Sequence, residues 1–439
     1  MSTEEAQVIR PSSRSVTKLH VENLFGRYTY EFDASDEPRS RLILIYGENG
    51  TGKTAILRLL FGLLAAKPAI IRSTLFTKLR VDFSDRTWVS VTKESPNSGT
   101  FFVSLSQPTD EGDLTLFEFE VTKTEAVQQG SDQPALRQYL AALNLVVYYL
   151  NDNRTLAVSA SEIDEEFALE RRSIRNRLDV TLRSPERVSS ERLQQMELEF
   201  ALRRLSSWIR RLYQRASIRG RENVNVIYKN IVDDIMHPHG KAMENVVQET
   251  SELIRALQEQ ALRSEDFAKY GLLNRVDVDS MVEAIKSSDD TKRLELIIDV
   301  VRPYVDGVRA SLDALSGLQE IIATLVNTLS DYYRRDKAVQ FSIPFGLSIV
   351  TNAGDQLSPA ALSSGEKHLL LLFANAVTSQ DKPSIFIIDE PELSLNFSWQ
   401  RTLVQSLLDL VKGGPTQFIM ATHSVEMLSL HMDNVVELA

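Results

Sequence analysis

The stretch Gly47-Glu48-Asn49-Gly50-Thr51-Gly52-Lys53-Thr54 matches the phosphate-binding pattern G-x-x-x-x-G-K-[ST]. An apolar segment precedes it and is typical of a buried strand, and the segment that follows is typical of a helix. Glycines allow backbone N–H groups to close around phosphate oxygens at the start of a helix. We therefore predict that Lys53 reaches the β- and γ-phosphates of a nucleotide and that the Thr54 hydroxyl holds Mg²⁺. The predicted binding residues are Gly47, Asn49, Gly50, Thr51, Gly52, Lys53 and Thr54.

A second cluster of polar residues follows an apolar run that begins at Ser384. This run ends in Asp389-Glu390-Pro391. Two adjacent carboxylates at the end of a buried strand are unfavourable without a cation, so we expect Mg²⁺ beside Asp389. Glu390 is then placed to polarise an attacking water. A further apolar run ends in Thr422-His423-Ser424, and a histidine at such a strand end can contact a γ-phosphate.

A third motif, Leu362-Ser363-Ser364-Gly365-Glu366-Lys367, precedes a run typical of a helix. Small residues before a helix form another N-terminus that can bind an anion.

In this order the motifs resemble the ATP-binding-cassette (ABC) ATPases, most closely the SMC/RecF/OLD-like branch. The resemblance covers roughly residues 15–155 and 337–439. It implies that two heads sandwich two ATP molecules, so that the signature loop of one head contacts the γ-phosphate held by the other. Its implied residues are Ser363, Gly365 and Glu366 for the nucleotide in trans, Thr54 and Asp389 for the metal, Glu390 as catalytic base and His423 as switch histidine. Glu366 stands where transporters usually carry glutamine, and Ser394 and Asn396 stand where many OLD-like proteins carry histidine.

The implied fold is α/β, a P-loop NTPase head of ABC type with a mostly parallel core sheet, an antiparallel β subdomain and a large helical insertion. We expect a flexible tail at 1–14, the two halves of the head at 15–155 and 337–439, and the insertion at 156–336. Residues 76–123 alternate with period two between turn residues, which predicts an antiparallel meander. The insertion is predicted to contain helices near 187–215, 223–236, 241–262, 278–287 and 306–334, without a sustained heptad repeat.

Two site positions stay open at the level of sequence. The residue that senses Mg²⁺ after the strand at 145–149 could be Asn151, Asn153 or Gln107, and Arg154 could touch phosphate. The aromatic residue stacked on adenine could be Phe25, Tyr28 or Tyr30, although all three are also consistent with sheet core.

Composition limits the possible classes of protein. The chain has 439 residues, 43% hydrophobic and 25% charged, with a net charge of −11, which is ordinary for a globular enzyme of two or three packed units. It has no cysteine, which excludes thiol catalysis, disulfides and cysteine-based zinc sites. No apolar run is long enough to cross a bilayer and the N-terminus is polar, so a cytoplasmic location without membrane contact is expected.

An arginine-rich stretch stands out in the predicted insertion. From Phe200 to Arg221 there are seven arginines and no acidic residue, and most of the arginines fall outside the apolar helical stripe. Those outside the stripe are Arg203, Arg204, Arg210, Arg211 and Arg215. Such a face suits nucleic acid or a partner protein, or is simply solvated, and the acidic chain favours a partner over a large DNA footprint.

Two classes of function remain. Standalone heads of this type resemble the ATPases of bacterial anti-phage systems such as Septu and PARIS, which implies a homodimer or higher homo-oligomer that controls a separate nuclease or toxin. No second carboxylate or histidine cluster that could cut DNA is visible, and we expect no nuclease domain after the head. The alternative is a RecF-like ATPase that acts on DNA during repair or recombination.

Overall fold

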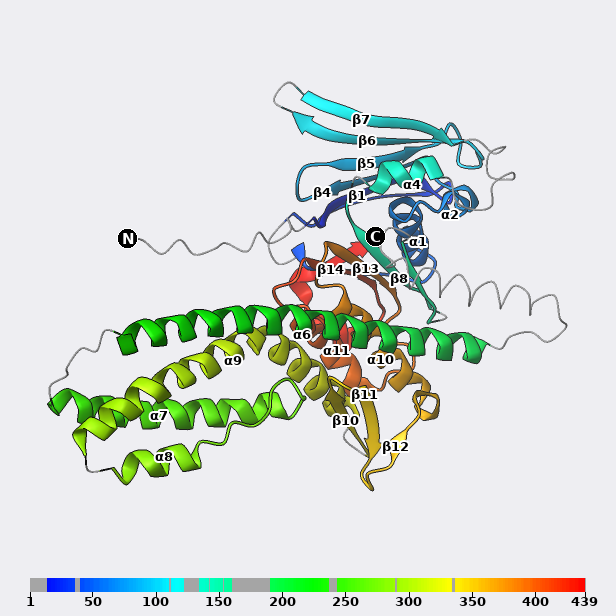
Figure 1. The fold of residues 1–439 in the computed structure, drawn as a ribbon. Coiled ribbons are helices and arrows are strands. Elements are labelled where there is room, and N and C mark those ends of the chain that lie inside the picture. The colour runs from blue at the N-terminus through cyan, green and yellow to red at the C-terminus, as the bar shows by residue number, and fades with distance from the viewer. Residues whose placement is uncertain are drawn as a thin grey trace. The chain divides into compact units, whose positions relative to one another are not determined.

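The computed structural model describes residues 14–35, 40–109, 112–121, 134–141, 143–152, 154–159, 190–236, 243–288, 290–333 and 336–438 (Figure 1). The chain divides into two compact units. The first, called here the head, comprises the chain up to Phe200 together with Ser363–Ala439, and the second, the helical unit, comprises Ala201–Leu362. The domain boundaries expected from the motifs remain a prediction.

The core of the head is a six-stranded sheet with the order β15-β3-β14-β13-β8-β9. Five neighbouring strands are parallel, and β9 is antiparallel to β8. The strands are β3 (Leu42–Gly47), β8 (Val146–Leu150), β9 (Leu156–Val158), β13 (Ser384–Asp389), β14 (Thr416–Ala421) and β15 (Val435–Leu438). Every residue of β8, β13 and β14 is buried, as expected for parallel strands that are covered on both faces. The predicted mostly parallel core sheet is thus confirmed.

A second six-stranded sheet is antiparallel, with the order β2-β1-β4-β5-β6-β7. Its strands are β1 (Val16–Leu24), β2 (Tyr28–Asp33), β4 (Lys78–Phe83), β5 (Trp88–Thr92), β6 (Phe101–Thr109) and β7 (Gly112–Val121). In β4 buried residues alternate with half-buried ones, which is the period of a strand with one face in the core. This sheet is the antiparallel subdomain that the period-two pattern predicts.

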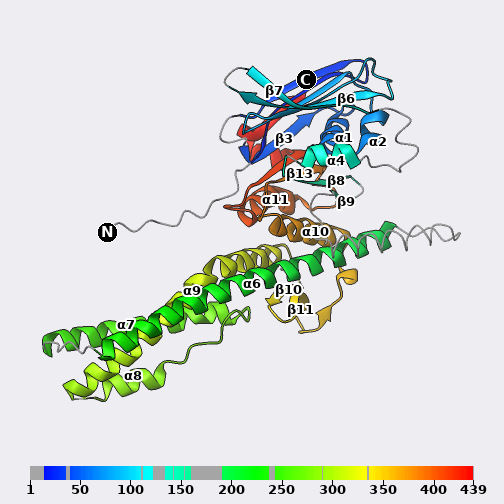
Figure 2. The same ribbon diagram turned by 45° about the horizontal axis from the view of Figure 1, so that its top comes forward.

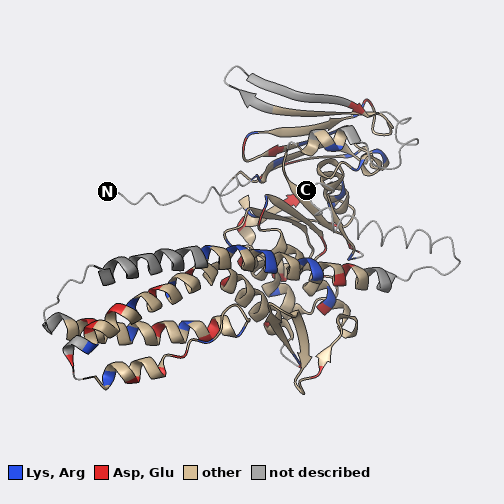
Figure 3. Cartoon of the chain, viewed as in Figure 1, with Lys and Arg blue, Asp and Glu red and all other residues tan. Residues whose placement is uncertain are grey.

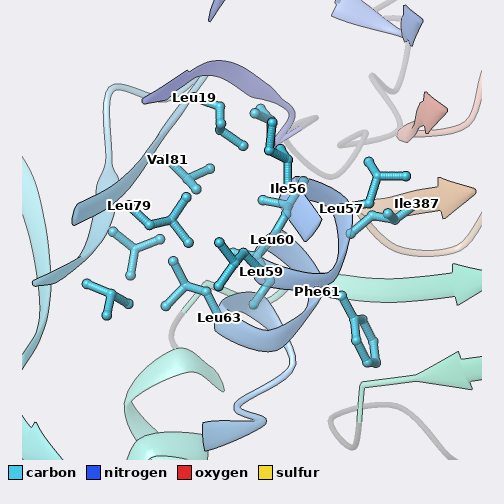
Figure 4. Close-up of a cluster of buried hydrophobic side chains, with 14 of the residues drawn as sticks. Leu19, Ile56, Leu57, Leu59, Leu60, Phe61, Leu63, Leu79, Val81 and Ile387 are labelled. Carbon is cyan, nitrogen blue, oxygen red and sulfur yellow. The ribbon is translucent and has the colours of Figure 1, made fainter. Parts of the chain in front are cut away.

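Helix α1 (Lys53–Leu64) has buried side chains on both sides, and residues of both sheets join it in one hydrophobic cluster. Figure 4 shows Leu60 and Leu63 of α1 turned toward Leu79 of the antiparallel sheet. On the other side of the helix, Leu57 lies near Ile387 of the parallel sheet. The remaining helices of the head are α2 (Pro68–Ser73), α4 (Pro134–Ala141), α10 (Ser364–Thr378), α11 (Phe397–Leu410) and α12 (Val425–Ser429). Because α1 begins at Lys53, its packing fixes the position of the phosphate-binding loop.

The helical unit contains most of α6 (Ser190–Met236), with α7 (Met243–Ala268), α8 (Asp279–Lys286) and α9 (Thr291–Tyr333). Helices α7 and α9 lie side by side in Figures 1 and 2, and their apolar faces share a core with α8 through residues such as Leu253, Val282 and Ile298. A small sheet of β10 (Lys337–Ser342), β11 (Gly346–Thr351) and β12 (Gln356–Leu357) completes the unit. None of the described helices is both long and apolar enough to span a membrane.

Two helix boundaries predicted from sequence are wrong. The helices predicted near 187–215 and 223–236 are, over the described residues, one continuous helix, α6 (Ser190–Met236), and Gly220 lies inside it without ending it. Helix α9 begins at Thr291 rather than near 306 and runs through Pro303. A proline in a helix interior removes one backbone hydrogen bond, but packing against α7 and α8 holds the helix on both sides of it.

Candidate nucleotide site

Three adjacent parallel strands deliver the predicted motifs to one edge of the core sheet. Strand β14 lies between β3, which leads into the phosphate-binding loop, and β13, which ends at Asp389. Across the strand ends, Thr422 N–H donates to the Ile45 carbonyl at 3.2 Å and Glu390 N–H donates to the Ala421 carbonyl at 2.9 Å. The phosphate-binding loop, the two carboxylates and His423 therefore leave the sheet at the same edge, with His423 in the loop after β14, the middle strand of the three.

The phosphate-binding loop has a backbone that favours glycine at two positions. Gly50 and Gly52 have φ angles of 87° and 96°, in the left-handed region. A side chain at Gly52 would also collide with Leu24 of β1, because an added Cβ would lie 2.8 Å from Leu24 Cδ2. The Tyr30 hydroxyl donates to the Thr51 carbonyl at 2.8 Å and ties the loop to the antiparallel sheet. Asn49 and Gly50 are exposed at the tip of the loop.

Lys53 is folded back onto its own loop. Its Nζ donates to the carbonyls of Gly47 and Glu48, both at 2.8 Å, and the side chain is 7% exposed. Burial lowers the pKa of Lys53, while the nearby carboxylates of Glu390, Asp389 and Glu392 act in the opposite direction. A phosphate group would offer this buried ammonium a charged acceptor in place of two carbonyls.

Asp389, the predicted metal ligand, lies buried at the end of β13. Its Oδ1 accepts a hydrogen bond from the Thr54 hydroxyl at 3.2 Å, and its Oδ2 is buried without a hydrogen-bond partner among the described residues. Burial raises the pKa of Asp389 to about 6, and the hydrogen bond from Thr54 opposes this shift. A buried carboxylate oxygen beside a hydroxyl is a hard-oxygen pair that suits Mg²⁺, which in nucleotide sites is held by one or two side chains together with phosphates.

Glu390 and His423 are connected by a residue to which the sequence reading gave no role. Glu390 has a φ of 49°, a left-handed conformation that a non-glycine residue adopts only when its surroundings enforce it. Two residues later, the Glu392 carboxylate accepts a hydrogen bond from His423 N–H at 2.7 Å. Glu392 thereby links the loop after β13 to the loop after β14. In the sequence, Glu390 and Glu392 lie two positions apart after an apolar run, and nothing in that pattern distinguishes their roles.

The signature residues have a structural role within their own chain. Ser363 is the N-cap of α10, and it forms a capping box in which its N–H donates to the Glu366 carboxylate at 2.7 Å. Gly365 is packed against the loop after β13, because an added Cβ would lie 2.6 Å from the Ser394 carbonyl oxygen. Ser363 is exposed, and among the described residues none of its hydrogen bonds joins it to the phosphate-binding loop of its own chain.

The residues after β8 lie beside the end of β13, where Asp389 is found. Leu150 pairs with Ile388 across the parallel ladder, so the next residues of both strands reach the same edge. Asn151 uses its side-chain oxygen to accept from Thr155 N–H at 2.8 Å, and Arg154 donates a hydrogen bond to the Ser394 hydroxyl. Arg154 therefore contacts the loop after β13, a connection that the sequence did not predict. Asn153 lies outside the described residues, and Gln107 lies on β6 of the antiparallel sheet.

A buried histidine lies beneath this contact. His368, in the second turn of α10, is 5% exposed and its ring lies near the backbone of Leu393 in the loop after β13. Burial lowers the pKa of His368 to about 4, and the charge of Arg154 acts in the same direction. His368 is therefore neutral at physiological pH.

Of the three candidate adenine platforms, only Phe25 presents an open ring. Phe25 is 42% exposed, and its Cε2 lies 3.4 Å from an ideal Cβ on Gly52. Tyr30 is buried, and its ring stacks with that of Tyr28 at a centroid distance of 5.7 Å. The two tyrosines belong to the support of the loop, whereas Phe25 lies at its surface.

Three comparisons with known proteins bear on this site. Residues 250–429 match a protein family described as "AAA domain, putative AbiEii toxin, Type IV TA system". The "Retron Ec83 probable ATPase" of Escherichia coli is 26% identical over 189 residues, and this match spans 38% of the chain and 32% of the relative.

One similar solved structure is the Smc head domain with an extended coiled coil bound to the C-terminal domain of ScpA, derived from Pyrococcus furiosus. The alignment covers 97% of this chain and 93% of that chain, with a TM-score of 0.36 and 13% sequence identity. The SMC head domain from Thermotoga maritima covers 94% of this chain and 91% of its own, with a TM-score of 0.31 and 14% identity. Scores this low carry no argument, so the fold assignment depends on the strand order and the positions of the motifs.

Proposed function

We propose that this chain binds ATP with Mg²⁺ and hydrolyses it at the edge of the sheet where β3, β14 and β13 end. The sheet order, the motifs and the sequence relatives support an ATPase of the SMC/ABC-like type. The observation that carries the proposal is the pair formed by Thr54 and Asp389. Their hydrogen bond leaves a buried carboxylate oxygen unpaired directly beside the start of α1. A buried carboxylate without a cation is unfavourable, and the α1 N-terminus is where a phosphate group would bind.

Each residue then has a defined task. Backbone N–H groups from Gly50 to Lys53 bind the phosphates, and the Lys53 ammonium exchanges its two carbonyl acceptors for phosphate oxygens. Thr54 and Asp389 hold Mg²⁺, which when bound neutralises charge on the phosphates. Glu390 accepts a proton from the attacking water, and His423 donates a hydrogen bond to the γ-phosphate.

Two substitutions separate binding from chemistry. Lys53→Ala removes the cation on the phosphates, and we expect loss of nucleotide binding measured by calorimetry. Glu390→Gln keeps the shape of the side chain but cannot accept a proton from water, so ATP affinity should persist while turnover falls by about 100-fold or more. Glu437→Gln, an exposed glutamate on β15, serves as the control with unchanged turnover. Equal loss of binding in the Lys53 and Glu390 variants would contradict the assigned roles.

We further propose that two heads form composite ATP sites, with Ser363 and Gly365 of one copy contacting the nucleotide of the other. This proposal is supported by the exposure of Ser363 at the N-terminus of α10, where backbone N–H groups point outward. Replacing Ser363 has to preserve the cap, because loss of an N-cap costs about 1 kcal/mol by itself. Aspartate and asparagine are both good N-caps and differ mainly in charge.

The matched pair Ser363→Asp and Ser363→Asn therefore tests the composite site. A negative charge facing the γ-phosphate should block ATP-dependent dimerisation, while the neutral asparagine should be tolerated. Mixing Ser363→Asp with Lys53→Ala protein should restore up to one intact site per heterodimer. If the two Ser363 variants dimerise equally well, or if mixing restores no turnover, the composite site is wrong.

The nucleotide cycle is proposed to control a separate effector protein, a nuclease or toxin, in anti-phage defence. The sequence similarity to the "Retron Ec83 probable ATPase" supports an ATPase of this kind, and the defence role itself is an analogy with the resemblance described above. Purification together with the product of the neighbouring gene, with and without ATP, is the direct test. Stimulation of turnover by DNA alone, with no stable protein partner, would instead favour a RecF-like repair ATPase.

A further inference from the structure

A phenylalanine projects from the tip of the hairpin that joins β10 and β11. Phe345 is 88% exposed, the highest exposed fraction among the large hydrophobic side chains of the described residues. The strands pair Ser342 with Gly346, so the loop contains only Ile343, Pro344 and Phe345. An apolar ring held at the apex of a short loop adds nothing to the core of its own chain.

The tip is anchored to two helices of the helical unit. The Arg210 guanidinium of α6 donates to the Pro344 carbonyl at 3.0 Å and to the Ile343 carbonyl at 3.4 Å. Ile343 N–H donates to the Tyr270 carbonyl, just after α7, at 3.1 Å. Gly346 has a φ of 74°, and an added Cβ there would lie 2.5 Å from the Ser206 hydroxyl of α6. The ring is thus presented on a fixed backbone.

The helix that holds the tip is basic at this point. Arg203, Ser206 and Arg210 are spaced three and four residues apart, so they share one face of α6, over about 10 Å of the helix axis. Arg203 and Arg210 are both exposed, and the sequence has no acidic residue from Phe200 to Arg221. Figure 3 shows several basic residues in blue along α6. The hairpin from Lys337 to Thr351 also contains no acidic residue. Within these two segments all charged residues are basic, although Glu199 lies one turn before Arg203 on α6 and the chain carries a net charge of −11.

We propose that Phe345, Arg203 and Arg210 form a binding patch for single-stranded nucleic acid. An exposed aromatic ring offers a face on which an unpaired base stacks, and arginine forks bind the adjacent phosphates. Arg210 has five N–H donors and uses part of them on the hairpin carbonyls, so the remaining donors are available for a phosphate.

The geometry favours a single strand over a duplex. In a duplex the base faces are stacked on one another, so the Phe345 ring would have no partner. The patch is also small and lies on an acidic chain, which suits a short contact rather than a large duplex footprint. The patch lies entirely within the helical unit, so the inference does not depend on ATP hydrolysis in the head.

The test measures the affinity of the full chain for a fluorescein-labelled oligothymidylate of about 20 nucleotides by fluorescence anisotropy. An oligouridylate of the same length is measured in parallel. Phe345→Ala should weaken binding by about 5- to 150-fold, the range for loss of one stacked base, and Phe345→Trp should bind about as tightly as wild type. Leu262→Ala, which removes a 70% exposed side chain of α7, is the matched control with unchanged affinity.

A second measurement addresses the arginines. Arg203→Gln should reduce the slope of log affinity against log salt by about 0.7, the value for one phosphate contact on a single strand. Arg309→Gln, on α9 and paired with Asp306, should leave the slope unchanged. Failure of wild type to bind either oligonucleotide at low salt, or equal affinity of Phe345→Ala and wild type, would overturn the proposal. Loss of a protein partner in Phe345→Ala with oligonucleotide binding intact would also overturn it, in favour of a protein-docking surface.

Discussion

The head and the helical unit differ in backbone strain: the head contains non-glycine residues with a positive φ, and the described part of the helical unit does not. Eight non-glycine residues have a positive φ among the described residues, and all eight lie in the head, including Arg154, Glu390 and Ser394. The described part of the helical unit has none and consists mainly of long regular helices. The head also buries Lys53 and Asp389, whereas the exposed arginines of α6 remain near solvent. Positive φ angles at non-glycine residues are thus confined to the head, and three of them, at Arg154, Glu390 and Ser394, lie around the proposed site, whereas the described helical unit has a regular backbone.

The largest expected effect concerns the buried charge of the head. The pKa of Asp389 in the folded protein is raised to about 6, against an ordinary value of 3.8. Between pH 3.8 and about pH 6, the folded chain binds more protons at Asp389 than the unfolded chain does. The contribution of the neutral carboxyl to the free energy of unfolding is therefore complete below about pH 4 and is lost as the pH rises through about 6. Asp389→Asn removes this titration. Its stability relative to wild type should therefore increase by up to about 3 kcal/mol from pH 4 to pH 7.5.

Urea unfolding at both pH values, without nucleotide or metal, measures this difference. Glu437→Gln, which replaces an exposed glutamate and retains Asp389, is the control and should lose stability between the two pH values as wild type does. If the stabilities of Asp389→Asn and wild type change in parallel between the two pH values, the pKa of Asp389 is not raised in the ligand-free head. The contrast between a head with a buried acid and a helical unit with exposed charges would then weaken.

A smaller effect is expected at the contact between α10, the helix that follows Ser363, and the loop after β13. Gly365→Ala would place a Cβ 2.6 Å from the Ser394 carbonyl, so one of the two segments has to move. Overpacking of this kind costs about 1–3 kcal/mol, which exceeds the helix propensity that alanine gains. Thermal unfolding should show a lower midpoint, and ATP turnover should fall because the loop carries Glu390. An unchanged midpoint would mean that the close contact is not maintained in solution.

The smallest expected effect is that of a glycine-to-alanine substitution in the helical unit, the counterpart of Gly365→Ala. Gly317 lies inside α9, and an added Cβ there meets no atom within 4 Å. Gly317→Ala should therefore raise the free energy of unfolding by up to about 1 kcal/mol through helix propensity alone. The same chemical change is thus predicted to have opposite signs in the two units, and thermal unfolding of both variants measures this directly. Equal signs would contradict the comparison.

Several predictions from sequence are confirmed because they depend on local chemistry. The strand before Gly47, the helix from Lys53 and the buried strand that ends at Asp389 follow from apolar runs and glycine spacing. The predicted break in α6 and the predicted start of α9 are wrong: α6 continues through Gly220 and α9 through Pro303, although both residues have low helix propensity. In both cases the local preference is weaker than the packing of the helix against its neighbours.

The sequence by itself determined the chemical groups of the head, because a phosphate-binding loop and two carboxylates after an apolar strand are recognisable without their surroundings. Only the tertiary structure decided which distant residues meet them. The contacts of Glu392 with His423 and of Arg154 with Ser394, and the anchoring of Phe345 by Arg210, join segments 31, 240 and more than 130 residues apart. Hydrogen bonds across such separations depend on strand order and helix packing, which no local pattern encodes.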